Sequence, residues 1–248
     1  MIIDHWKLMK VFNVRIDNLT KEEILNQIEL FLAEPRFHQI TTINPEFILE
    51  AQKNSEFRNV LNASDLNVAD GVGIGLAFWR FGKFLKTRLA GADLMLEILR
   101  LAEEKNLKIF LATNRDGLSS FEETKAAILK KFPSLKISGH NFDIKNPSIR
   151  PHKEGLEKQG GKGCEVLFCN FGAPFQELFI NSQKCDTIRL AIGVGGSFEY
   201  LTGKVRRAPK WMRKIGLEWL WRLILQPKRI GRIFRAVIVF PVKVIFSK

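Results

Sequence analysis

Cysteine is scarce in this sequence of 248 residues, which holds only Cys164, Cys169 and Cys185. Three scattered cysteines exclude a disulfide framework and favour a reducing compartment. Cys164 and Cys169 have no second pair at a spacing that would complete a zinc site. We therefore expect no bound metal and no other cofactor.

Long apolar runs are also absent. The longest run near the C-terminus covers residues 236–242 and contains Pro241, whereas a helix that spans a bilayer needs about 20 apolar residues. The first residues lack the basic stretch and the apolar run of a signal peptide. We expect a cytoplasmic protein whose contact with a membrane is peripheral.

Acidic residues almost disappear from residues 204–248. This segment holds 13 of the 39 Lys and Arg residues but only Glu218 of the 26 acidic residues, so its net charge is +12. Residues 1–203 therefore carry only +1 of the formal net charge of +13. Such asymmetry indicates a polyanionic partner, which can be a nucleic acid, an anionic lipid surface or a phosphorylated substrate.

Hydrophobic periodicity along residues 1–203 predicts strands that alternate with helices. We expect strands over residues 11–16, 38–43, 66–69, 108–112, 135–140, 165–170 and 188–193. Helices are expected to begin at Thr20, where Glu23 completes a capping box, at Pro45, and at the stretch from Gly71 to Gly75. Further helices are expected over residues 92–103, 119–131 and 174–181, with an irregular connection over residues 146–162. This alternation predicts an α/β domain with a largely parallel sheet flanked by helices.

The segment of residues 204–248 has a different character. Residues 211–225 predict a helix with aromatic and basic faces, which Pro227 ends. A second helix then carries basic residues spaced three or four apart on one face, namely Lys228, Arg229, Arg232 and Arg235. Helices of this kind suit an anionic membrane surface. We predict two parts, an α/β core of residues 1–203 and a basic amphipathic helical C-terminal appendage of residues 204–248.

Polar or glycine-rich sequences follow four predicted strands, and parallel sheets bind ligands at the carboxyl ends of their strands. Two glycine stretches, at residues 71–75 and 193–196, lack the third glycine of the dinucleotide fingerprint. Their backbone amides can hold phosphate, or the stretches can be simple tight turns. Asp70 stands between a strand and a glycine turn, where it can act as a general base or form an Asx turn with Gly71.

Eight segments carry a family resemblance, at residues 42–46, 69–73, 88–94, 172–177, 193–198, 203–211, 216–222 and 226–229. The most specific part is the run Arg207-Ala208-Pro209, followed by Gly216-Leu-Glu-Trp219. In this order, over about residues 10–235, the chain resembles the WecG/TagA/CpsF family, which is glycosyltransferase family 26.

The resemblance implies a Rossmann-like core and an inverting transfer that is independent of a bound metal. The donor would be the UDP derivative of an N-acetylmannosamine-type sugar. The acceptor would be undecaprenyl-diphosphate-linked N-acetylglucosamine, a polyprenyl-diphosphate glycolipid used in cell-surface polysaccharide or teichoic-acid synthesis. The appendage would dock on the inner face of the bacterial cell membrane and complete the active site. Assembly into a homo-oligomer is left open.

By position, Asp70 matches the proposed general base of the family. Substrate contacts are expected from Thr42, Asn44, Gly71, Gly73, Arg88, Gln176, Gly193, Gly195, Arg206, Arg207, Arg222 and Arg229. Two positions depart from the family pattern, because Phe175 replaces a lysine and Glu199 replaces an aspartate that many members have.

The sequence alone leaves two rival functions open. A nucleic-acid-binding protein would use the basic appendage alone. That function does not explain the polar residues at the strand ends of the core. A non-catalytic membrane adaptor would not need Asp70. We therefore expect a sugar transferase with no nucleic-acid partner.

Overall fold

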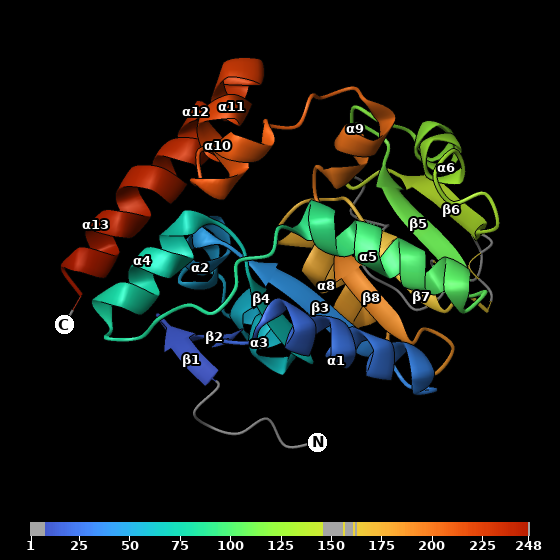
Figure 1. The fold of residues 1–248 in the computed structure, drawn as a ribbon, viewed down its shortest axis with the longest axis horizontal. Helices are drawn as coiled ribbons and strands as arrows, with labels where there is room; N and C mark the ends of the chain where they lie inside the picture. The colour runs from blue at the N-terminus through green and yellow to red at the C-terminus, as the bar shows by residue number, and fades with distance from the viewer. Residues whose placement is uncertain (1–7, 146–155, 157–160, 162, 248) are drawn as a thin grey trace.

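The computed structural model describes residues 8–145, 156, 161 and 163–247. Within them, six parallel strands form a central sheet in the order β4-β3-β8-β7-β5-β6 (Figure 1). The strands are β3 (His38–Ile43), β4 (Leu66–Ala69), β5 (Lys108–Asn114), β6 (Lys136–Phe142), β7 (Val166–Cys169) and β8 (Leu190–Gly193). The predicted α/β architecture with a parallel sheet is confirmed.

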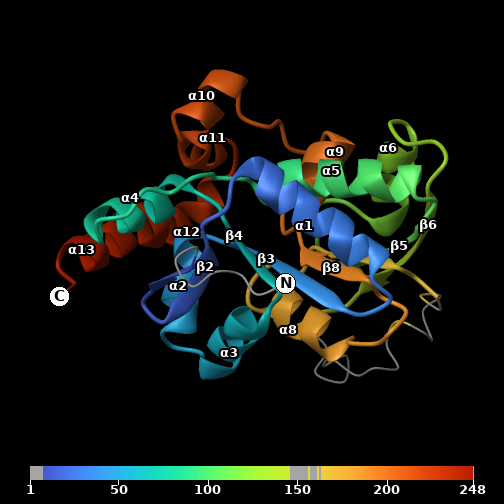
Figure 2. The same ribbon diagram turned by 60° about the horizontal axis from the view of Figure 1, so that its bottom comes forward.

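Helices cover both faces of this sheet. α1 (Lys21–Ala33) and α5 (Gly91–Glu104) lie on one face, and α8 (Phe175–Ser182) lies on the other (Figures 1 and 2). In β7, Val166 and Phe168 join the apolar cluster of α1 and α5, whereas Leu167 and Cys169 join the cluster of α8. Because alternate side chains point to opposite faces, a strand covered on both sides is apolar throughout. Among the described residues, the core also contains α2 (Pro45–Ala51), α3 (Ser55–Ala63), α4 (Val72–Arg80), α6 (Phe121–Leu129) and α9 (Ser197–Thr202).

The single strand predicted over residues 11–16 is wrong. The chain forms a separate antiparallel hairpin there, of β1 (Leu8–Val11) and β2 (Val14–Asp17). Its two turn residues, Phe12 and Asn13, have φ values of 47° and 64°. A two-residue turn with both φ values positive matches the right-handed twist of a hairpin. Asn tolerates this conformation but Phe rarely adopts it, so the apolar Phe12 hid the turn within an alternating pattern.

Side-chain caps fix the starts of two helices. Glu23 N–H donates to Thr20 Oγ1 at 3.2 Å, and Thr20 N–H donates to Glu23 Oε2 at 2.8 Å. Phe47 N–H donates to Asn44 Oδ1 at 3.1 Å at the start of α2. The predicted helix starts at Thr20 and Pro45 are confirmed. The predicted connection over residues 146–162 lies outside the described residues, apart from 156 and 161.

The appendage is helical, as predicted, but its breaks differ. The helix expected over residues 211–225 is divided into α10 (Lys210–Lys214) and α11 (Glu218–Leu225), because Gly216 adopts a φ of +81°. The second helix continues beyond Arg235, through η4 (Pro227–Arg229), α12 (Ile230–Phe234), the π-helical turn η5 (Arg235–Val239) and α13 (Phe240–Ile245). Proline in a helix clashes with the preceding turn, and the wider π turn directly before Pro241 provides room for its ring.

The last helix of the appendage packs beside α4 (Figure 1). Phe240 and Val244 are fully buried in the apolar cluster that contains Ile74, Ala77 and Phe78 of α4. The guanidinium group of Arg80 donates to the carbonyl groups of Ile245 and Ser247 at 3.2 and 2.9 Å. The appendage therefore shares a core with the α/β domain in this structure. No helix among the described residues is long and apolar enough to cross a bilayer.

Candidate active site

A cavity of about 830 Å³ lies at the carboxyl ends of the strands, between the core and the appendage. Its walls come from the segments that follow β3, β4, β5, β7 and β8, from the start of α5, and from the helices of the appendage. Open α/β sheets bind ligands at this edge. The cavity is therefore the candidate active site.

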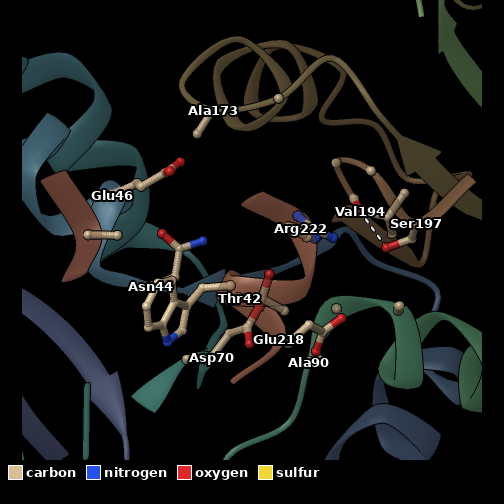
Figure 3. A pocket seen from close by; sticks show the side chains of 18 of the residues that line it. Thr42, Asn44, Glu46, Asp70, Ala90, Ala173, Val194, Ser197, Glu218 and Arg222 are labelled. Atoms are coloured by element: carbon tan, nitrogen blue, oxygen red, sulfur yellow. Dashed lines mark hydrogen bonds between the residues drawn. The ribbon is translucent and has the colours of Figure 1, made fainter. Parts of the chain in front are cut away.

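The structure brings nearly all of the predicted site residues together. Those that line the cavity are Asp70, Thr42, Asn44, Gly71, Gly73, Arg88, Gln176, Gly193, Gly195, Arg207, Arg222 and Arg229. Figure 3 shows Thr42, Asn44, Asp70, Glu218 and Arg222 gathered around the same space, although they come from three different segments. Arg206 is the exception, because its side chain is exposed and lies outside the cavity lining. Its backbone carbonyl accepts a hydrogen bond from Trp221 Nε1 at 2.9 Å, so Arg206 contributes to the fold of the appendage through its backbone.

Asp70 follows β4 directly, and its backbone N–H donates to the carbonyl of Ile43 at 2.8 Å. Gly71 turns the chain with a φ of +86°, so that α4 begins at the next residue. Burial and, next, the nearby Glu218 carboxylate raise the pKa of the Asp70 carboxyl, whereas Arg222 and Arg88 lower it, and the net result is a pKa of about 6. A carboxylate with a pKa close to the working pH is a better proton acceptor than an ordinary aspartate.

Arg88 lines the cavity, but its guanidinium group is already engaged. Arg88 NH2 donates to the carbonyl of Arg213 at 2.6 Å, at the end of α10. Val72 and Arg88 approach the backbone of residue 216 so closely that only glycine fits there. A Cβ on Gly216 would lie 1.9 Å from Val72 Cγ1 and 2.9 Å from Arg88 NH1. Arg88 therefore ties the end of α10 to the segment between α4 and α5.

Arg207 is paired within the protein as well. Its two terminal nitrogens donate to Asp93 Oδ1 and Oδ2 at 2.6 and 2.7 Å, which is the planar, bidentate arrangement that arginine forms with carboxylates. Arg213 lies 3.6 Å from the same Asp93 oxygen. The Asp93 carboxylate balances the guanidinium charge of Arg207, and this pair ties the appendage to the start of α5.

Arg222 and Arg229 face the loop that follows β8. A Cβ placed on Gly196 would lie 3.8 Å from Arg222 NH2 and 3.9 Å from Arg229 NH2. Arg222 Nε donates to the Tyr200 hydroxyl, and its guanidinium lies 5.0 Å from the centre of that ring. Burial and the positive charges of Arg222 and Arg232 lower the pKa of Arg229. Two adjacent, partly buried guanidinium groups beside a glycine loop form a site for an anion.

Gln176 joins the two glycine loops after β7 and β8. Its Oε1 accepts hydrogen bonds from Gly172 N–H at 3.0 Å and from Gly195 N–H at 3.2 Å. The amide of Gly195, which the sequence offers as a phosphate ligand, is thus already donated to Gln176. Anion binding at this loop therefore depends mainly on the side chains of Arg222 and Arg229.

Sequence reasoning missed several residues that line the cavity, and Tyr200, Glu46 and Asp93 are among them. Glu46 pairs with Arg232, whose Nε lies 3.1 Å from Glu46 Oε2. Glu218 lies inside the motif run of residues 216–219, but its position in the sequence predicts no role for it in the site. Of the two departures from the family pattern, Glu199 lines the cavity and Phe175 is exposed outside it.

The described residues contain no group of three His, Cys, Asp or Glu side chains placed to hold a metal ion. Asp93 and Glu46, which lie in the cavity wall, are paired with arginines instead. That the reaction needs no metal stays a prediction.

The sequence matches the profile of the glycosyl transferase WecG/TagA/CpsF family over residues 9–248. The chain belongs to this family. The match covers the α/β core and the appendage together, and the predicted family and enzyme class are confirmed. The molecule is therefore a glycosyltransferase.

Three relatives of known name are similar in sequence to this chain. Proteins from Bacillus spizizenii strain W23 and Bacillus subtilis strain 168 are 31% and 32% identical to this glycosyltransferase over 194 residues, which is 78% of this chain and 73% of each relative. A protein from Staphylococcus aureus strain MRSA252 is 29% identical over 245 residues, which is 96% of this chain and 92% of the relative. All three are named N-acetylglucosaminyldiphosphoundecaprenol N-acetyl-beta-D-mannosaminyltransferase.

Proposed function

We propose that this glycosyltransferase moves an N-acetylmannosamine-type sugar from UDP to N-acetylglucosamine on undecaprenyl diphosphate, for cell-surface polysaccharide or teichoic-acid synthesis. One observation carries the proposal. A carboxylate at the end of β4, Asp70, and two guanidinium groups of the appendage, Arg222 and Arg229, line the same cavity. The names of the relatives support the acceptor and the sugar, and the UDP donor follows from the family resemblance.

In the proposed reaction, a hydroxyl oxygen of the acceptor sugar attacks the anomeric carbon of the donor from the side opposite the leaving group. Asp70 takes the proton of that hydroxyl as the new bond forms. General-base assistance of this kind contributes about 10²- to 10⁴-fold to the rate. The bond between the anomeric carbon and the diphosphate breaks, and the configuration at this carbon is inverted.

The diphosphate of UDP gains negative charge as it leaves. Arg222 and Arg229 are placed to bind it, because a guanidinium group binds two phosphate oxygens at once. Arg207 and Arg88 keep these groups in position by bonding the appendage to the core. Positive charges fixed in place before the reaction stabilise the developing charge without reorganisation.

We also propose that the appendage rests on the anionic inner face of the cell membrane, where the lipid-linked acceptor resides. Many of its apolar side chains are exposed, namely Trp211, Ile215, Ile224, Leu225, Ile230, Phe234, Ile238, Val242, Ile245 and Phe246. Exposed Lys228 and Lys243 lie among them. Each basic residue near an anionic surface contributes about 1 kcal/mol to binding, so a few of them, with apolar insertion, hold a protein reversibly.

The test is release of UDP from UDP-N-acetylmannosamine in the presence of a short-chain lipid-diphosphate N-acetylglucosamine. UDP-N-acetylglucosamine and the uronic acid of UDP-N-acetylmannosamine serve as competing donors, and acceptor without its diphosphate serves as the control. We expect acceptor-dependent release that Asp70→Asn reduces by at least about 100-fold. Equal release with and without acceptor, or full activity of the variant, would refute the proposed function.

A further inference from the structure

Glu177 is a buried carboxyl directly behind the cavity. It is the third residue after the proline that precedes α8, and its side chain is almost fully buried. Glu177 Oε1 accepts a hydrogen bond from Gln176 Nε2 at 2.6 Å, whereas Oε2 has no partner among the described residues. A buried carboxyl without a cation beside it requires an explanation, because such groups are costly to bury.

The contact with Glu177 determines which way the Gln176 amide points. Gln176 Oε1 must face two donors, the N–H groups of Gly172 and Gly195. If the amide were turned over, its NH2 group would face these two donors and both hydrogen bonds would be lost. Glu177 Oε1 accepts from Nε2 and so favours the orientation in which Gln176 joins the two loops.

The surrounding backbone leaves this pair little freedom. A Cβ on Gly193 would lie 2.3 Å from Gln176 Nε2 and 2.6 Å from Glu177 Oε1, so the two side chains fill the space against the end of β8. Gln39 of β3 donates from Nε2 to the Glu177 carbonyl at 3.2 Å. The pair is therefore fixed by β3 and β8 and transmits its position to the loop of Gly195 and Gly196, which faces Arg222 and Arg229.

We propose that Glu177 is a positioning residue for the transfer reaction, which locks the Gln176 amide and thereby the two glycine loops that face the leaving group. The inference rests on the proposed function. A neutral carboxyl also keeps negative charge away from the site where the diphosphate would bind. Ionisation of Glu177 would place an uncompensated negative charge behind that site and so oppose binding of the diphosphate.

The surroundings of Glu177 support the neutral form. Burial raises its pKa to about 8, against smaller opposing effects of Gln176 and a backbone amide. The groups that face it are the Cys169 thiol of β7, whose pKa burial also raises, and the uncharged Gln39 of β3. α3, which packs on α8, buries only Phe57, Val60 and Leu61. We therefore expect the carboxyl to keep its proton at neutral pH and to lose it in mildly alkaline solution.

The experiment compares two substitutions of Glu177 across pH 6 to 9, with kcat and KM measured from UDP release. Glu177→Gln preserves an oxygen that accepts from Gln176 and cannot ionise. Glu177→Leu removes the acceptor. Wild-type kcat/KM should fall above about pH 8, and Glu177→Gln should retain most of the activity at pH 7 and lose this alkaline fall. Glu177→Leu should remain folded and lose about tenfold or more of kcat/KM at pH 7, since small displacements of a site are costly.

Asp17→Asn provides the matched control. Asp17 is also a buried carboxyl whose pKa burial raises, but it bonds to Asn67 N–H and lies outside the cavity lining. This variant should leave the alkaline fall in place. The proposal is overturned if Glu177→Gln keeps the alkaline fall, if Glu177→Leu has wild-type kcat/KM, or if Asp17→Asn abolishes the fall.

A second measurement separates this inference from the proposed function. If the wild-type protein turns over none of the three UDP-sugars, the proposed function fails, and calorimetric binding of UDP then tests Glu177. We expect weaker UDP binding at pH 9 than at pH 7 in the wild-type protein and no such difference in Glu177→Gln. An equal loss of affinity in both proteins would refute the role of Glu177.

Discussion

The packing of Phe240 against the core provides the sharpest test of how the last helix of the appendage is docked. Phe240 is fully buried, its ring lies edge-on to Phe12 with centroids 6.3 Å apart, and a Cβ on Gly73 would come within 3.3 Å of it. Removal of a buried Phe side chain costs about 3–5 kcal/mol. Because Phe240 lies in the last helix, we expect Phe240→Ala to weaken docking of this helix by about 10²- to 10⁴-fold.

Hydrogen exchange followed by mass spectrometry measures this docking directly. Amides of residues 227–247 should exchange faster in Phe240→Ala, while those of β3, β7 and β8 should keep their protection. Val242→Ala is the matched control, because Val242 is 49% exposed on the same helix and its loss should change stability by less than about 0.5 kcal/mol. A point variant is also cleaner than removal of residues 204–248, which would expose the face of α4 that Phe240 covers.

Two results would refute this reasoning. If protection falls equally in the sheet and in residues 227–247, the appendage and the core unfold as one unit. If Phe240→Ala exchanges like Val242→Ala, the buried ring does not hold the helix in place.

Three further predictions concern Asp70 and Gly216, which line the candidate active site. Asp70 must lose its proton to act as a base, so kcat/KM should rise with pH through about 6, and a flat profile from pH 5 to 7 would contradict this assignment. A carboxyl whose pKa rises from 3.8 to about 6 on folding destabilises the folded state once it ionises. Asp70→Asn should therefore raise the free energy of unfolding at pH 7, measured by urea titration, by up to about 3 kcal/mol. An unchanged or lower free energy of unfolding would count against the burial of Asp70. Gly216→Ala should destabilise docking of the appendage by about 1–3 kcal/mol, because φ at this residue is +81° and Val72 occupies the space that the new Cβ needs. Hydrogen exchange of residues 210–225 equal to that of the wild type would disprove the clash.

Local signals in the sequence predicted most of the fold. β3 was predicted with its observed bounds, and the Thr20–Glu23 capping box is present, because both depend on side chains close together in the chain. The hairpin at residues 8–17 could not be predicted in the same way, since Phe12 in a left-handed turn opposes its local preference. Packing against β4, with the hydrogen bond from Asn67 N–H to Asp17, stabilises the hairpin from far along the chain.

The site shows the same division between local and distant causes. The strand ends identified Asp70 as a cavity residue, because parallel strands bring their carboxyl ends to one edge, and the family resemblance identified Gln176. Arg206 and Arg207 could not be distinguished, since their positions depend on the path of an irregular stretch. Arg207 finds its partner, Asp93, 114 residues away, and no local pattern encodes that pair.

Glu218 links the appendage to the chemistry of the base, and this link can be tested alone. It comes from α11, beyond the core, yet its carboxylate is the largest influence on Asp70 after burial, and it raises the pKa. Glu218→Gln should therefore move the acid limb of the kcat/KM profile to lower pH. It should also lower the rate at neutral pH, because a less basic carboxylate accepts a proton less readily.

The direction of the shift distinguishes Glu218 from its neighbours. Arg222, on the same helix, lowers the pKa of Asp70, so Arg222→Gln should move the acid limb to higher pH. Opposite shifts from two residues of α11 would show that the appendage sets the proton affinity of the base through charge. An acid limb that stays in place in both variants would assign it to a group other than Asp70. Shifts in the same direction would indicate a general change in burial when α11 is disturbed.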